Sequence, residues 1–296
     1  MRPTIERANH LYLFTLLLIL LATPLIQWLN FYHGVLLAEL LLILPTLLFM
    51  ARDRLPLGYT LRLRWPGWRL LGWSALAAAL AYIIATSLTA ATRYLYSQLG
   101  TSLPMFIPPV ADGRQFAWTL FIGGLVASIA EEVLFRGYLL RAYEAFGSLQ
   151  GVIITGLLFG MFHLSFQNLV PSAFLGIVMG YLVYRTDSLW AGIVAHFTNN
   201  MIAFSIAYFS YATGAVHGEV GPQTIMFMGL LAFVSLFLLG ALFRRIEGQT
   251  APDSIAEGAS IWANLARLTQ TWPLAMALVI FFTMAYSEFL LVFGRL

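Results

Sequence analysis

FAWTLFIGGLVASIAEEVLFRGYLL, residues 116–140, is an apolar stretch long enough to cross a membrane as a helix, and three charged residues interrupt it. The fifteen residues before Glu131 carry no charge, and apolar character resumes after Arg136. An ionised side chain in the middle of the bilayer costs roughly 2.5 to 3.5 kcal/mol, so three of them facing lipid would cost about 7 to 10 kcal/mol. We therefore expect these charges to face other helices or enclosed water, inside a bundle of membrane helices.

The spacing of the three charges separates their roles. Glu132 and Arg136 are four residues apart, so they face each other on a helix and can form an ion pair. Glu131 points about 100° away from Glu132 and is available to other partners. The three residues could simply hold the bundle together, but a pair of adjacent glutamates with its own arginine favours a functional site.

The composition predicts an all-α, polytopic membrane protein, because 60% of the 296 residues are hydrophobic and only 10% are charged. All sixteen basic residues are arginines, which we attribute to membrane orientation, and we expect no binding to nucleic acid. The sequence has no cysteine, which excludes disulfides, thiolate metal sites and a cysteine nucleophile.

Apolar runs predict about nine membrane spans and a cytoplasmic N-terminus. In that orientation thirteen of the sixteen arginines are cytoplasmic, in accordance with the positive-inside rule. One of the inner loops, between Arg52 and Arg69, also contains two tryptophans and suits an anionic lipid surface. The predicted spans are 11–29, 34–50, 70–92, 116–140, 152–166, 171–184, 189–208, 224–243 and 272–293, and residues 94–115, 211–222 and 244–270 are predicted as polar or loop connections. No linker divides the chain, so we treat 1–296 as one integral-membrane domain.

Two later spans contain polar residues at helical spacing. Phe159 and His163 lie in one of them, and His196 and Asn200 lie four residues apart in the other, on a shared face. Taken singly, each histidine is most simply a packed residue with one hydrogen bond. Because these residues and the glutamate pair fall on three helices within 70 residues, we interpret them as one site.

These residue types suit hydrolysis of a peptide bond without a covalent intermediate. A glutamate in a membrane cavity can act as a general base toward water, and an imidazole beside it can position that water. A second imidazole and an amide can donate hydrogen bonds where negative charge develops on a carbonyl oxygen. The zinc motif H-E-x-x-H and the serine motif G-x-S-x-G do not occur in the sequence, although two glutamates and two histidines could still hold a metal ion.

Three further acidic residues receive simpler interpretations. We expect Glu39 in the second span and Glu288 in the last span to be protonated or interfacial. Asp187 lies in a short turn beside Arg185 and has no partner aspartate, so we expect it to be solvated.

Three motifs occur in a fixed order: E-E-x-x-x-R at Glu131, Glu132 and Arg136, F-x-x-x-H at Phe159 and His163, and H-x-x-x-N at His196 and Asn200. Together they resemble the CAAX protease and bacteriocin-processing (abortive infection) family, whose members are intramembrane glutamate proteases related to the Ras-converting CAAX endopeptidase. The resemblance covers about residues 116–206 and leaves the flanking helices 11–92 and 224–293 outside.

The resemblance implies a role for each motif residue. Glu131 would activate a water molecule together with His163, while His196 and Asn200 would form the oxyanion hole. Glu132 and Arg136 would support the site, and Phe159 would line its cavity. The family also implies an all-α core around a cavity open to the cytosol and the membrane, with no obligatory metal or other cofactor.

From the same resemblance we expect an integral protein of a prokaryotic plasma membrane whose site opens toward the cytoplasm. Its partners would be membrane lipid and a membrane-associated protein or peptide substrate. Two alternatives have different consequences: a non-catalytic immunity protein or chaperone that binds a peptide in the same cavity, and a metal-dependent membrane hydrolase.

Overall fold

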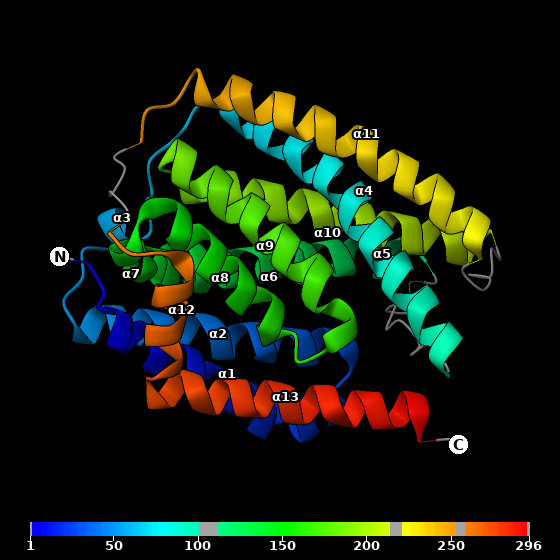
Figure 1. Ribbon diagram of the computed structural model, residues 1–296, viewed down its shortest axis with the longest axis horizontal. Helices are drawn as coiled ribbons and strands as arrows, with labels where there is room; N and C mark the ends of the chain where they lie inside the picture. The colour runs from blue at the N-terminus through cyan, green and yellow to red at the C-terminus, as the bar shows by residue number, and fades with distance from the viewer. Residues whose placement is uncertain (1, 101–109, 111, 214–220, 253–257, 295–296) are drawn as a thin grey trace.

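The computed structural model describes residues 2–100, 110, 112–213, 221–252 and 258–294, and within these ranges the chain is helical and contains no strand. Figure 1 shows the long helices running roughly side by side along the length of the molecule. The all-α prediction is confirmed. The helices are α1 (Ile5–Trp28), α2 (Phe31–Arg52), α3 (Leu57–Thr60), α4 (Trp68–Leu99), a composite helix (Gly113–Phe146), α8 (Ser148–Phe162), α9 (Phe166–Thr186), α10 (Leu189–Ala212), α11 (Pro222–Glu247), α12 (Ile261–Thr269) and α13 (Trp272–Phe293).

Every predicted span falls on a helix, and seven of these helices are long and apolar enough to cross a membrane. They are α1, α2, α4, the composite helix, α9, α11 and α13. α8 has only 15 residues, about 22 Å of helix, and α10 is also outside this set. The architecture is that of a multi-pass membrane protein, while the nine crossings and the cytoplasmic N-terminus stay predictions.

Several predicted boundaries are wrong. α8 ends at Phe162, four residues early, because Leu164 has a positive φ of 50° and Ser165 accepts a hydrogen bond from Asn168 N as the N-cap of α9. α4 continues to Leu99, into the predicted loop 94–115. The predicted polar stretch 244–270 contains the end of α11 and the whole of α12. Parts of all three predicted connections lie outside the described residues.

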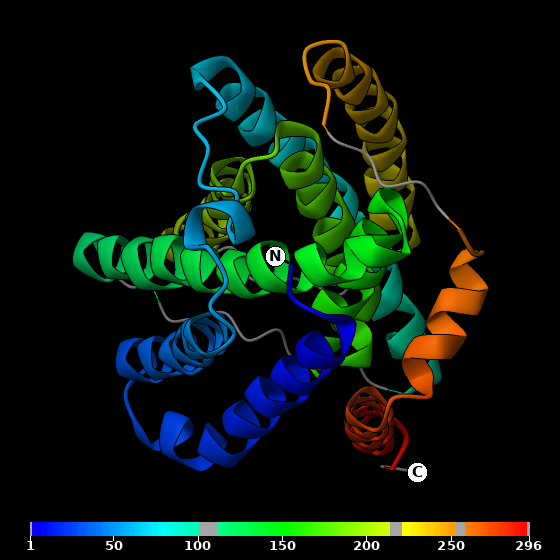
Figure 2. The ribbon, with the colours of Figure 1, turned by 90° about the vertical axis from the view of Figure 1, so that its left-hand side faces the viewer.

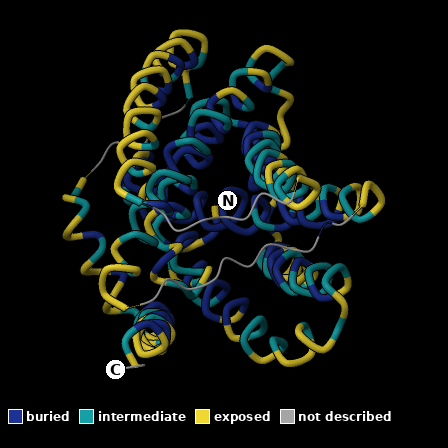
Figure 3. Tube along the Cα trace, turned by 90° about the vertical axis from the view of Figure 1, so that its right-hand side faces the viewer, coloured by how far each residue is buried: buried dark blue, intermediate teal, exposed yellow. Residues whose placement is uncertain are grey.

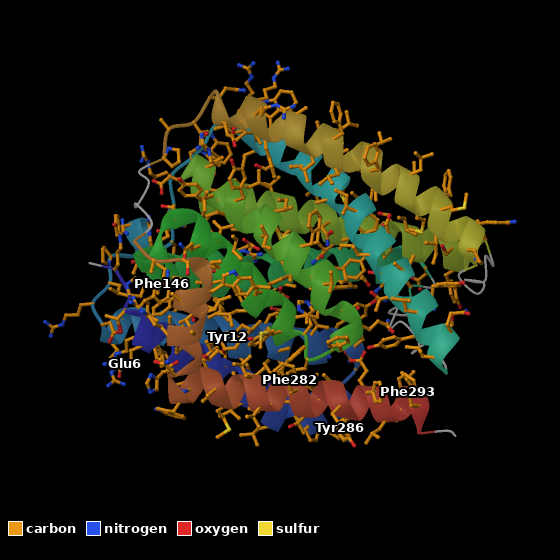
Figure 4. The ribbon with its side chains drawn as sticks, in the orientation of Figure 1. Glu6, Tyr12, Phe146, Phe282, Tyr286 and Phe293 are labelled. Carbon is orange, nitrogen blue, oxygen red and sulfur yellow. The ribbon has the colours of Figure 1, made fainter. Side chains whose placement is uncertain are left out.

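The helices fall into three groups in space. The composite helix, α8, α9 and α10 lie in the middle, α4 and α11 cover one side, and α1, α2 and α13 cover the other (Figure 1). Figure 3 shows that buried residues concentrate toward the centre, while the outer helices are largely exposed. Large apolar side chains such as Phe233 on α11 and Phe282 on α13 are 72% and 60% exposed, as suits a surface that faces lipid. Figure 4 labels Phe282 on α13.

Small residues bring the central helices close together. A Cβ on Gly156 of α8 would stand 2.8 Å from Ile177 N, and one on Gly176 of α9 would stand 2.9 Å from Gly156 Cα, so the two backbones are in contact. The alanine-rich α4 buries Ala77, Ala78 and Ala81 against its neighbours. This close packing fixes the positions of the backbone carbonyls of α9, including that of Gly176, which accepts a hydrogen bond in the candidate site.

Candidate active site

The predicted ion pair between Glu132 and Arg136 is present and completely buried. Arg136 Nη1 donates to Glu132 Oε1 over 2.5 Å, and both side chains are 0% exposed. Arg136 Nη2 also donates to the carbonyl of Gly176 over 3.1 Å, and its guanidinium lies 4.6 Å from the centre of the Phe159 ring. A carboxylate that is completely buried and paired with a buried arginine is unavailable for proton transfer with a substrate, so we assign Glu132 a structural role.

The composite helix that carries the glutamates is not a regular α-helix. Two π-helical segments, η1 (Leu120–Val126) and η2 (Val133–Leu139), flank the short α6 (Ala127–Glu132), on which both glutamates lie. Such wide turns free backbone groups and often occur at functional sites. Here the carbonyl of Gly123, within η1, accepts a hydrogen bond from Asn200 Nδ2 over 3.1 Å. The sequence predicted an apolar helix at this place and contained no signal for its π-helical turns.

His196 joins the two glutamates. Its Nδ1 lies 3.0 Å from Glu132 Oε1, and its Nε2 lies 3.8 Å from Glu131 Oε2. Because Glu132 as a carboxylate paired with Arg136 can only accept, Nδ1 of His196 must carry the hydrogen. Nε2 can then donate only if the ring is an imidazolium, a charge that both glutamates face directly. Glu131 itself is 21% exposed at the side chain, so it is the accessible member of the pair.

His163 lies at the C-cap of α8 and is exposed, rather than within a span as predicted. Its Nδ1 donates to the carbonyl of Phe159 over 2.9 Å, since a carbonyl can only accept, and this leaves Nε2 free to accept a hydrogen bond. The ring of Phe159 packs against both imidazoles, with centroid distances of 5.0 Å to His163 and 5.9 Å to His196. Phe159 is thus the common wall between the two histidines.

Asn200 is held by the composite helix. Its amide donates one hydrogen to Gly123 O, and its Oδ1 accepts from Asn199 Nδ2 over 3.2 Å. The second hydrogen of the Asn200 amide is available for another acceptor. His196 and Asn200 therefore both attach α10 to the helix that carries the glutamates, His196 at α6 and Asn200 one π-helical segment earlier.

Glu39 of α2 is a third carboxylate beside the site, which the sequence interpretation did not include. It is buried, its Oε2 has no hydrogen-bond partner, and it lies close enough to Glu131 for the two groups to interact electrostatically. The signal was present in the sequence, because an acidic residue in the middle of an apolar span marks a functional position by default. Nothing in the sequence indicated that Glu39 and Glu131, which are 92 residues apart in the chain (131 − 39), lie close together in space.

Glu288, which the sequence analysis expected to be protonated or interfacial, caps the start of α9. This carboxylate accepts from Phe166 N over 2.7 Å and from Gln167 N over 2.9 Å, and Tyr96 also donates to it. Both amides belong to the first turn of α9, where the helix dipole favours a negative charge. Glu288 therefore attaches α13 to the junction that directly follows His163.

The described residues contain no group of three or more histidine, aspartate or glutamate side chains arranged to hold a metal ion. The site has two carboxylates and one imidazole in a row, with a guanidinium on the inner carboxylate. This arrangement resembles a proton-transfer site more than a cation site, since Arg136 already supplies the positive charge beside Glu132.

Comparison with known protein families identifies a match to the central part of the chain. Residues 113–202 match a protein family described as Rce1-like, Type II CAAX prenyl endopeptidase. The matched segment runs from the start of the composite helix into α10 and contains all seven predicted site residues. No curated protein and no solved structure matches the chain.

Proposed function

We propose that this chain, a member of the CAAX protease family, is an intramembrane endopeptidase that uses Glu131 to activate water. The observation that carries the proposal is the asymmetry of the glutamate pair. Glu132 is sealed against Arg136, whereas Glu131 is partly exposed and faces the second nitrogen of the same imidazole. One carboxylate is thus available for proton transfer while its neighbour keeps His196 in place.

The proposed reaction is direct attack by water on the peptide carbonyl. Glu131 removes a proton from the water while His163 accepts a hydrogen bond from it through Nε2, and the water oxygen bonds to the carbonyl carbon. The carbonyl π electrons move to oxygen and form the tetrahedral oxyanion. When the oxyanion collapses, the C–N bond breaks and the leaving amine takes the proton from Glu131, which restores the starting state.

Negative charge on the carbonyl oxygen requires hydrogen-bond donors, and in this proposal α10 supplies two of them. His196 donates from Nε2 as the imidazolium, and Asn200 contributes its second amide hydrogen. Loss of one such donor typically costs about 2.7 to 4 kcal/mol of transition-state stabilisation. Arg136 holds Glu132 through their ion pair, and the ring of Phe159 packs against both imidazoles and so limits their movement.

The substrate in this proposal is a protein or peptide held at the membrane, lipidated or anchored near its C-terminus, because the exposed apolar surface of the bundle confines the enzyme to the bilayer. Location in a prokaryotic plasma membrane, with the site open to the cytoplasm, is part of the proposal.

The deciding experiment measures turnover by the purified, membrane-reconstituted chain on a prenylated CAAX peptide and on an unlipidated membrane-anchored peptide. We expect many product molecules per protein, a single cleavage site by mass spectrometry, and loss of both in Glu131→Gln and His163→Ala variants that keep the native melting temperature. Peptide binding at fixed stoichiometry without product would instead identify the non-catalytic alternative. Wild-type turnover by Glu131→Gln would end the glutamate mechanism.

A further inference from the structure

We propose that a pocket at one end of the bundle binds a phosphate group. The pocket has a volume of about 130 Å³ and is lined by arginines from separate parts of the chain: Arg2, Arg62, Arg64 and Arg141. Figure 2 faces this end and shows the N-terminus next to α3, in agreement with the hydrogen bond from Arg2 Nε to the hydroxyl of Tyr59. The inference does not depend on proteolysis.

Positive charge exceeds negative charge in this cluster. Two carboxylates face the four guanidinium groups: Asp187, which lines the pocket, and Glu144, which pairs with Arg62 and Arg141. The formal balance is +4 − 2 = +2. The expectation that Asp187 is merely solvated is wrong, since it lies 3.0 Å from Arg62, 3.2 Å from Arg64 and 3.5 Å from Arg141.

Arg62 has a donor without a partner. The residue is only 3% exposed, its Nε donates to Asp187, its Nη2 donates to Glu144, and its buried Nη1 has no hydrogen bond. Its backbone has a positive φ of 50°, which is unusual for a residue with a side chain, and its two carboxylate partners hold the guanidinium group in the interior. A guanidinium group with an unpaired donor keeps part of its positive charge uncompensated, and because Arg62 lines the pocket, this charge attracts an anion there.

The other guanidinium groups are already oriented. Arg141 donates through Nε and Nη2 to the carbonyl of Tyr59, over 3.3 Å and 2.8 Å, and its guanidinium lies 4.5 Å from the centre of that tyrosine ring. Arg64 is 79% exposed at the side chain and reaches Asp187 with one nitrogen. Like charges held this close repel one another, so a ligand of opposite charge is favoured.

A phosphate group fits these donors better than a carboxylate. It has three or four oxygens for guanidinium groups that converge from several directions, and it carries up to two negative charges, which match the surplus. A carboxylate would offer two oxygens and neutralise only one charge.

The surroundings of the pocket indicate where the phosphate comes from. Arg62 and Arg64 belong to the loop that ends in Trp65 and Trp68, whose rings pack edge to face 4.7 Å apart and are largely exposed. Exposed tryptophans beside arginines are typical of the level of lipid headgroups. The phosphate can therefore belong to an anionic lipid or be free in solution, and the chemistry of the pocket is the same for both.

The first experiment uses inorganic phosphate and the full-length chain in neutral detergent, with ionic strength held constant by chloride. We expect saturable binding in calorimetry and a melting temperature that rises with phosphate, because a ligand of the folded state stabilises it. Arg64→Gln should weaken binding about tenfold. Arg52→Gln removes an equal charge from a nearby exposed position that does not line the pocket, and should leave the affinity within about twofold.

Arg62→Lys keeps the positive charge but lacks the planar guanidinium group with its several donors. We expect this variant to remain folded and to lose most of the phosphate-dependent rise in melting temperature. In phosphatidylcholine nanodiscs, added phosphatidic acid should suppress phosphate binding if lipid is the source. Unchanged phosphate binding there would identify free phosphate, and either result supports the pocket. The proposal is overturned if phosphate binding is absent, if Arg52→Gln and Arg64→Gln weaken it equally, or if acetate or a peptide C-terminus binds in preference.

Discussion

Gly192 of α10 lies directly against the carboxylate of Glu132, so that a Cβ on Gly192 would overlap Glu132 Oε2 and stand 2.6 Å from Val183 Cγ2. Glu132 is fully buried and cannot move toward solvent to make room. The close approach is what allows His196, one turn further along α10, to reach both glutamates. A residue outside the recognised motifs therefore determines whether they can come together.

Gly192→Ala should lower the cleavage rate about tenfold or more, because the added methyl group displaces Glu132 and with it the imidazole of His196. Overpacking of this kind should also reduce the free energy of unfolding by about 1 to 3 kcal/mol. Gly240→Ala on α11 is the matched control, since a Cβ there meets nothing within 4 Å. Equal behaviour of the two variants in rate and melting temperature would contradict the packing argument.

Glu132→Gln should destabilise the protein strongly, by about 3 to 5 kcal/mol, because it leaves the buried charge of Arg136 without its partner. Arg136→Met should have a similar effect for the converse reason. We expect the double variant to be less destabilised than the sum of the two single changes, as measured by denaturation of the reconstituted protein. Additive changes in the free energy of unfolding would show that the interaction between Glu132 and Arg136 does not stabilise the protein.

Glu288→Gln should weaken the start of α9 by about 0.5 to 2 kcal/mol, because a neutral amide oxygen caps two backbone amides less well than a carboxylate. Hydrogen exchange should become faster at Phe166 and Gln167 first. Tyr286→Phe alters an exposed residue of the same helix and should leave that exchange unchanged. If both variants exchange alike, the cap is not what holds this junction.

Exhaustive chelation should leave cleavage unchanged, because the proposed proton transfer uses Glu131 and two imidazoles and places Arg136 where a cation would otherwise sit. The measurement compares turnover before and after dialysis against a chelator, with zinc or magnesium added back as a second arm. Activity that disappears and returns with one metal would support the metal-dependent alternative.

Local spacing was enough to predict the helical class, the approximate positions of the long apolar helices and the ion pair of Glu132 with Arg136. These features depend on residues a few positions apart, whose geometry a helix repeats every turn. The three motifs could likewise be grouped from their order in the chain, and the matching family covers the same segment.

Contacts between distant helices were decided only by the tertiary structure. The end of α8 at His163 depends on the backbone of Leu164, and the position of Glu39 beside Glu131 depends on how α2 packs. The lining of the arginine pocket comes from residues as far apart in the chain as Arg2 and Pro252. No periodicity in a sequence records which faces of separate helices meet, because that choice depends on the packing of the whole bundle. The sequence alone therefore identified the charged residues of the site. Their contacts with other helices were determined by the tertiary structure, in which glycines such as Gly192 allow the helices to approach closely.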